Sequence, residues 1–164
     1  MKRSLNVVHV IHSLGPGGAE HTLVDLAAEA PKQDINMSVV SLMGLGSASY
    51  PKQLRDLGIA VRSLDLSSRW DPRGLSRGLR VIRDLQPQLV HTHLKHADLL
   101  GPWAAHRLEF PMVSTLHLIE DAPTGVGRAK RWLAAQAGWR RAERTLAGSQ
   151  ALGSSYLATF DPKP

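Results

Sequence analysis

The chain has 164 residues, of which 43% are hydrophobic and 21% charged, and this length is enough for one domain with a sizeable core. It contains no cysteine, which excludes a disulfide framework and a thiolate metal site. No apolar run approaches the ~20 residues of a membrane helix, and because the first residues do not resemble a signal peptide we expect a cytoplasmic protein. The net charge of +6 favours an anionic partner, either nucleic acid, a phospholipid surface or a phosphorylated substrate.

Residues 7–30 are typical of a strand, a glycine-rich turn and a helix. A run of β-branched residues ends at Ile11, the turn contains Gly15, Gly17 and Gly18, and a helical pattern then continues until Pro31. Such a turn lies at the carboxyl end of a strand, where free N–H groups and the helix dipole favour an anion. The turn predicts a phosphate or sugar site, and a tight turn without a ligand is the alternative.

Two familiar phosphate loops are excluded at this turn. Glu20 stands where a dinucleotide fingerprint has its third small residue. A P-loop would continue with Lys and Ser or Thr after Gly18, and the chain has Ala19 and Glu20 instead.

Strands and helices are expected to alternate along the rest of the chain. The expected strands after the first are 36–42, 59–64, 88–92, 111–116 and 144–149, and the expected helices after the first are 50–57, 72–85, 97–108, 128–141 and 150–159. This alternation predicts an α/β fold, namely a Rossmann-like three-layer α/β/α domain with a mainly parallel sheet of about six strands. The domain is expected to span residues 1–159, with 160–164 as the start of a linker.

Histidines follow or end several of these strands. His12 follows the first strand, His91 and His93 lie at the end of the fourth, and His117 follows the fifth. Because parallel strands end at one edge of a sheet, these side chains are expected to converge there. The His-x-His spacing also fits a metal-dependent hydrolase, although the nearby carboxylates, Asp98, Glu120 and Asp121, have no clear place in it.

The order of four motifs resembles a known family. Gly-Gly-Ala-Glu at 17–20, the strand with its two histidines at 88–93, the strand with its histidine at 113–117, and the segment 141–149 follow one another at suitable spacings. This pattern is similar to the amino-terminal, acceptor-side domain of family-four retaining glycosyltransferases, which have the two-domain GT-B fold. The resemblance covers nearly the whole chain.

The resemblance implies transfer of a sugar of the hexosyl type from a nucleotide-sugar donor, with retention and without a metal or other cofactor. It implies that His93 contacts the transferred sugar, with His91 as the second choice. The substrate- or phosphate-binding residues that it implies are Gly17, Gly18, Glu20, His117 and Arg144.

The nucleotide-binding carboxy-terminal domain of this family is absent from the chain, so the chain alone is expected to be inactive and to need that domain as a partner. Lipid-linked or cell-envelope glycans are the acceptors that the resemblance implies. A non-catalytic module that binds phosphate or sugar is the main alternative.

Two basic clusters raise the question of a membrane surface. They consist of Arg69, Arg73, Arg77 and Arg80, and of Arg128, Lys130, Arg131, Arg140 and Arg141 beside Trp132 and Trp139. Docking on the anionic inner face of the membrane is the functional interpretation, and a solvated outer face is the other. Nucleic acid is disfavoured because aromatic residues are few and no nucleic-acid motif is present.

Overall fold

The computed structural model describes residues 4–46, 49–66, 72–93, 104, 106–117 and 144–154. The expected helix 128–141, most of the helix 97–108, the second basic cluster, Arg69 and the expected linker 160–164 lie outside these residues. The described elements are β1 (Leu5–Ile11), α1 (Gly18–Glu29), η1 (Ala30–Gln33), β2 (Ile35–Ser41), α2 (Tyr50–Asp56), β3 (Ala60–Ser63), α3 (Pro72–Asp84), β4 (Leu89–His93), β5 (Met112–Leu116) and β6 (Arg144–Ala147).

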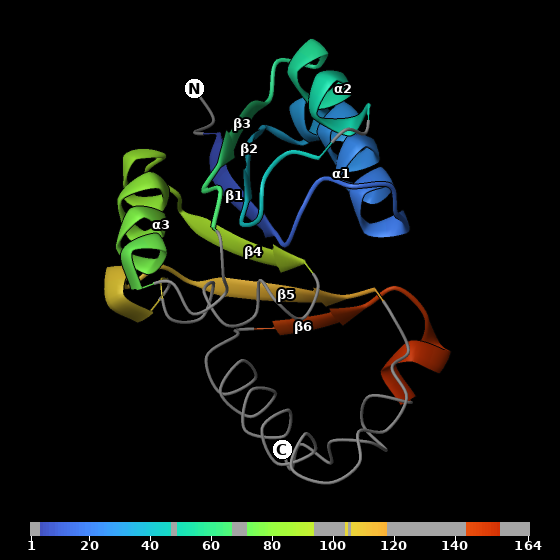
Figure 1. Cartoon of the computed structure of the whole chain (residues 1–164). Helices are drawn as coiled ribbons and strands as arrows, with labels where there is room; N and C mark the ends of the chain where they lie inside the picture. Colours follow the sequence, from blue (N-terminus) through green and yellow to red (C-terminus); the bar gives the residue numbers. More distant parts are fainter. Residues whose placement is uncertain are drawn as a thin grey trace, which may run out of the picture.

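The strands form one six-stranded sheet in the order β3-β2-β1-β4-β5-β6. Every neighbouring pair is parallel, which confirms the predicted fold (Figure 1). The chain starts in the middle of the sheet, builds outward to β3, then returns to β4 on the other side of β1. The order in which strands are added to the sheet thus reverses between β1 and β4, and open α/β sheets bind their ligands at such a point.

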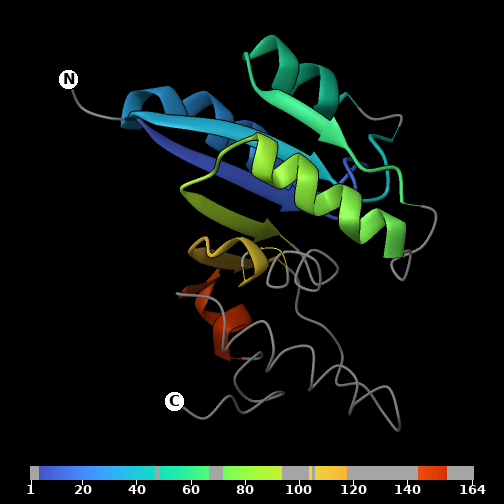
Figure 2. The same cartoon turned by 90° about the vertical axis from the view of Figure 1, so that its left-hand side faces the viewer.

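Both faces of the central strands are buried, as the continuous apolar run in β1 predicts. One face carries Val8, Val10 and Val40 and packs against Ile82 of α3. The opposite face carries Ile11 and Val39 and packs against helices α1 and α2, through Leu23 and Leu54. Figures 1 and 2 show the resulting layers, with α3 on one side of the sheet and α1 and α2 on the other.

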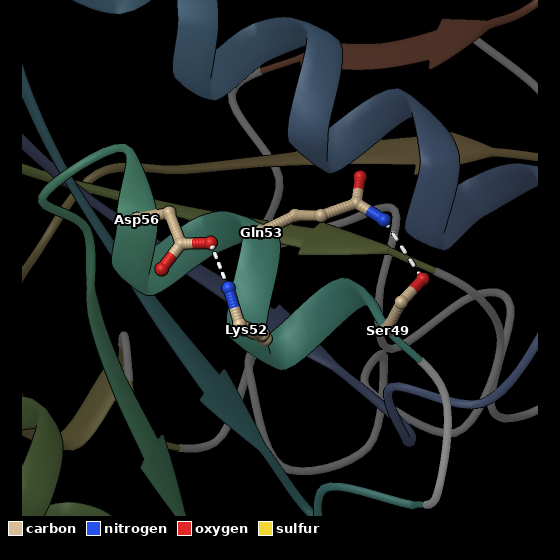
Figure 3. A network of polar contacts seen from close by, with 4 residues as sticks. All are labelled: Ser49, Lys52, Gln53 and Asp56. Atoms are coloured by element: carbon tan, nitrogen blue, oxygen red, sulfur yellow. Dashed lines mark hydrogen bonds and ion pairs between the residues drawn. The ribbon is translucent and has the colours of Figure 1, made fainter.

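Short polar contacts support the small helix α2 (Figure 3). Lys52 donates to the Asp56 carboxylate at 2.6 Å, and the amide of Gln53 donates to the hydroxyl of Ser49 at 2.8 Å. Pairs four residues apart lie on one face of a helix, where they add a few tenths of a kcal/mol, roughly 0.2–0.5 each. A seven-residue helix is too short to persist without such contacts and its packing on the sheet.

Helix α3 carries part of the first basic cluster. Arg77 and Arg80 are exposed, whereas Ile82 faces the sheet. The Arg77 guanidinium also donates to the carbonyl of Leu64 at 2.7 Å, which ties the helix to the end of β3. Among the described residues, no helix is both long and apolar enough to cross a bilayer.

Candidate functional site

The glycine turn after β1 is supported by the loop that follows β2. Leu42 N–H donates to the carbonyl of Ile11 at 3.0 Å, and Met43 N–H donates to the carbonyl of His12 at 2.9 Å. Gly46 has a φ of +65°, and a Cβ on it would lie 3.4 Å from the carbonyl of Leu14. A side chain at this position would be strained and crowded, so Gly46 lets the two loops pack closely at the carboxyl edge of the sheet.

Gly17 and Gly18 begin α1, and Glu20 lies in its first turn. Gly17 has an extended backbone that any residue can adopt, so its φ angle does not require glycine at this position. A Cβ on Gly17 would instead collide with the Glu20 carboxylate, which folds back over it, whereas a Cβ on Gly18 would meet open space. The group that comes close to Gly17 is therefore the carboxylate of Glu20, a residue that is only 7% exposed.

This carboxylate changes the electrostatics of the turn. A negative charge in the first helical turn is stabilised by the helix dipole. An incoming phosphate at the same terminus would be repelled by it, while a hydroxyl group could donate to it. The structure brings Gly17, Gly18 and Glu20 together, with a charge that favours a hydroxylated ligand over an anion.

Four histidines gather on the face of the sheet that α1 covers. His9 lies beside His91 in the β1–β4 register, and Ile11 lies beside His93. Because side chains two residues apart in a strand point the same way, His9, His91 and His93 share one face. His117 follows β5 directly, two residues after Thr115, which lies beside His93 in the β4–β5 register.

Three of these rings form a hydrogen-bonded chain, which we call the imidazole chain. Nδ1 of His9 lies 2.8 Å from Nε2 of His93, and Nδ1 of His93 lies 3.0 Å from Nε2 of His117. His91 lies beside this chain, with its ring tilted against that of His93 and the two ring centroids 4.1 Å apart. Its own Nε2 lies 2.7 Å from the hydroxyl of Thr115.

Burial keeps these imidazoles neutral. His9 and His93 are 5% and 1% exposed. Burial, with a smaller contribution from His91, lowers the pKa of His9 from 6.5 to about 3. Burial, together with His117, lowers the pKa of His91 to about 4. The pKa of His93 is also well below 6.5, first through burial and then through the neighbouring histidines, and burial lowers that of His117.

Three of the four histidines are also close enough together to hold a metal ion. The nearest ring nitrogens of His9, His91 and His93 lie within 4.8 Å of one another. A set of imidazoles alone suits zinc or copper rather than magnesium, which prefers oxygen ligands. Both nitrogens of His93 are already hydrogen-bonded to other rings, so coordination by His93 would replace one of these bonds.

The structure brings together most of the residues that the sequence singles out, but not all of them. His91, His93 and His117 converge as expected, and Glu20 joins the two glycines at the turn. Arg144 opens β6 beside Val113, so it lies toward the amino end of the sheet, away from the edge where His117 follows Leu116. Its expected contact with a phosphate stays a prediction without support from this placement. His12 is half-buried beyond the end of β1.

His9 is the site residue that the sequence reasoning missed. It lies among three valines and one isoleucine in β1, two residues before the strand ends. A polar residue within an apolar run is the sequence signal that could have identified it. Burying an imidazole without a hydrogen-bond partner is costly, so such a residue indicates a polar partner nearby. The partner, His93, is 84 residues away in the sequence.

A fully parallel sheet with this strand order, and a site at its carboxyl edge, defines a Rossmann-like domain of the kind found in GT-B glycosyltransferases. The family comparison is more specific. Residues 16–164 match the model of Glycosyltransferase Family 4, and the chain belongs to this family. A search of curated proteins gave no match.

Several solved structures share the fold. HepE of Anabaena in complex with UDP and glucose has a TM-score of 0.74 and 19% identity, over 94% of this chain and 41% of HepE. A glycosyltransferase of Rickettsia africae has a TM-score of 0.74 and 14% identity, over 99% of this chain and 41% of that protein. A UDP-N-acetylglucosamine 2-epimerase has a TM-score of 0.67 and 16% identity, over 99% of this chain and 46% of the epimerase. The chain thus spans less than half the length of these proteins.

Proposed function

We propose that this chain is the acceptor-side domain of a retaining, metal-independent glycosyltransferase of the hexosyl type that uses a nucleotide-sugar donor. Membership of family 4 supports sugar transfer, and HepE, with a similar fold, is known in complex with UDP-glucose. The observation that carries the proposal for the site is the imidazole chain, which runs from inside the sheet to its carboxyl edge and ends at His117.

His117 is the histidine that would contact the ligand. Both ring nitrogens of His93 are engaged within the imidazole chain, and its side chain is almost completely buried. His117 is half-buried and uses only Nε2 in the chain, so within the described residues its Nδ1 makes no hydrogen bond and could contact a sugar or phosphate oxygen. His93 then acts through His117 as a positioning residue, and His91 supports the arrangement from the side.

The glycine turn would hold the acceptor rather than the donor diphosphate. The Glu20 carboxylate over Gly17 repels phosphate and accepts hydrogen bonds from hydroxyl groups. A glycan or a lipid-linked sugar supplies such hydroxyls. The donor diphosphate is then left to the nucleotide-binding domain that GT-B enzymes carry as their second half.

The exposed arginines of α3 would favour a peripheral place at an anionic membrane surface, on the cytoplasmic side. Arg77, Arg80 and Arg83 are exposed on this helix. Basic residues near an anionic surface contribute about 1 kcal/mol each. Such a surface is also where lipid-linked acceptors reside.

One specific observation favours a second candidate, a metal-dependent activity. The ring nitrogens of His9, His91 and His93 are close enough to share one ion. Zinc bound by three histidines activates water for hydrolysis in other enzymes. In that case chelation would abolish the activity, whereas the proposed transferase keeps it.

The decisive experiment joins this chain to a nucleotide-binding GT-B domain and assays it with a panel of nucleotide sugars in the presence of EDTA. We expect transfer with retained anomeric configuration, and no transfer by the 164-residue chain alone. Activity that disappears with EDTA and returns with zinc would support the metal-dependent candidate. Saturable sugar binding without transfer, in the joined protein, would support a non-catalytic module. Transfer by the chain alone would contradict the need for a second domain.

A further inference from the structure

The two hydrogen bonds of the imidazole chain restrict where its protons can lie. A neutral imidazole has one N–H donor and one bare nitrogen that accepts. His93 makes one bond through each nitrogen, to His9 and to His117. It must therefore donate to one neighbour and accept from the other.

This restriction couples all three rings. If His93 carries its proton on Nδ1, it donates to Nε2 of His117 and accepts from Nδ1 of His9. The protons of His9 and His117 then also lie on Nδ1. If His93 carries its proton on Nε2, both bonds reverse and all three protons lie on Nε2. The three rings thus share one tautomer, provided that they are neutral.

Burial of His9 decides between these two states. Within the described residues, Nε2 of His9 makes no hydrogen bond, and the side chain is almost fully buried. A proton on this atom would be a buried donor without an acceptor, and orphaned buried N–H groups are rarer in folded proteins than under-satisfied acceptors. The state with all protons on Nδ1, which leaves no buried N–H without an acceptor at His9, should therefore be favoured.

We propose that His9, His93 and His117 all carry their proton on Nδ1, so that His117 presents a neutral N–H donor to an oxygen atom of the bound ligand. His9 is then a positioning residue: it touches no substrate and sets the proton of His117 through His93. The lowered pKa values of the three rings agree with neutral imidazoles at physiological pH.

This arrangement limits the chemistry of His117. A ring with its proton on Nδ1 and its Nε2 engaged with His93 cannot serve as a general base toward the ligand. It can stabilise an oxygen that gains negative charge during the reaction. The identity of that oxygen, on a sugar or a phosphate, rests on the proposed function, whereas the position of the protons does not.

The test is the tautomer of each ring in the 164-residue chain, labelled with ¹⁵N-histidine and kept in EDTA at about pH 7.5, well above the ordinary histidine pKa. Two-bond ¹H–¹⁵N correlation spectra separate protonated from bare ring nitrogens, and single substitutions assign the rings. We expect Nδ1–H at His9, His93 and His117. His21, exposed on α1 and outside the imidazole chain, is the internal control and should not show this fixed tautomer. A proton on Nε2 of any of the three rings would overturn the proposal, whether or not the protein transfers sugars.

A pair of matched variants tests the coupling directly. In His9→Asn the amide near the position of Nδ1 can either donate or accept, so His93 and His117 should still share one tautomer but lose the fixed preference for Nδ1–H. In His9→Asp the carboxylate has nearly the same shape as the Asn amide. When ionised it only accepts hydrogen bonds, so the protons of His93 and His117 should both move to Nε2. Reversal of one ring without the other would contradict the coupled chain. If the buried carboxylate prevents folding, the spectra of the unsubstituted chain still decide the proposal.

Discussion

Acidification should unfold this protein through its buried histidines. The folded state lowers the pKa of His9 to about 3 and that of His91 to about 4, whereas an unfolded histidine has a pKa of about 6.5. Between these values the unfolded chain binds more protons, so the free energy of unfolding falls as the pH falls. The loss begins near pH 6.5 and continues to about pH 4 for His91 and about pH 3 for His9.

The magnitude follows from the distance between the pH and the unfolded pKa. One pH unit corresponds to about 1.4 kcal/mol for each histidine. At pH 5, about 1.5 units below the unfolded pKa, His9 and His91 should each cost roughly 2 kcal/mol of stability. Their sum of about 4 kcal/mol is a large part of the 5–15 kcal/mol that stabilises a typical domain. With a urea dependence of about 2 kcal/mol per molar, the unfolding midpoint should fall by about 2 M.

Urea unfolding at about pH 7.5, 6 and 5 measures this loss. In His9→Asn the loss between the highest and lowest pH should shrink by about 2 kcal/mol, because one titrating group is gone. The matched control is Val39→Ala, a cavity on the same buried face. It should lower stability by about 2 kcal/mol at every pH, without changing the pH dependence. A loss below about 1 kcal/mol in the unsubstituted protein, or an equal loss in His9→Asn, would refute the reasoning.

Three further predictions concern the proposed site and surface. Glu20→Gln should tighten the binding of inorganic phosphate to the chain, measured by calorimetry, because it removes the negative charge at the start of α1; unchanged or weaker binding would mean that Glu20 does not repel anions there. His93→Ala should lower the turnover of the joined enzyme, while His93→Asn, which can keep the bond to Nε2 of His117, should recover part of it; equal loss in both variants would indicate a merely structural role. The chain should sediment with anionic but not neutral vesicles. The binding should weaken as salt is added, because salt screens exposed charges over a Debye length of roughly 10 Å at 0.1 M. Equal binding to both kinds of vesicle would reject the membrane proposal.

Much of the fold follows from local patterns in the sequence. The β-branched run ending at Ile11 predicts a strand buried on both faces, and Val8 and Ile11 indeed pack on opposite sides. The pattern breaks at Pro31 because the chain leaves the α-helix there, although it first adds the short helix η1. Strand ends are predicted to within about two residues, since hydrogen bonding to a neighbour decides the final residues of a strand.

The site is less predictable because it depends on register between distant strands. His91, His93 and His117 could be placed at one edge from strand order alone. The pairing of His9 with His91 needs the β1–β4 register, which no local pattern contains. This register also brings His93 close enough to His9 and His117 for both of its ring nitrogens to form hydrogen bonds. The role of Gly17 likewise cannot be predicted from the sequence, because it depends on where the Glu20 side chain folds.

The most direct test of the central claim is the turnover of the joined enzyme after His117→Ala. This variant removes the only ring of the imidazole chain that is both half-buried and open at Nδ1 among the described residues. We expect kcat to fall by about a hundredfold, as when one hydrogen bond to a developing charge is lost, with little change in stability. His106→Ala, an exposed histidine that precedes β5 at the opposite end of that strand, is the matched control and should keep full turnover. Unchanged turnover in His117→Ala would contradict the claim that the imidazole chain forms the catalytic edge.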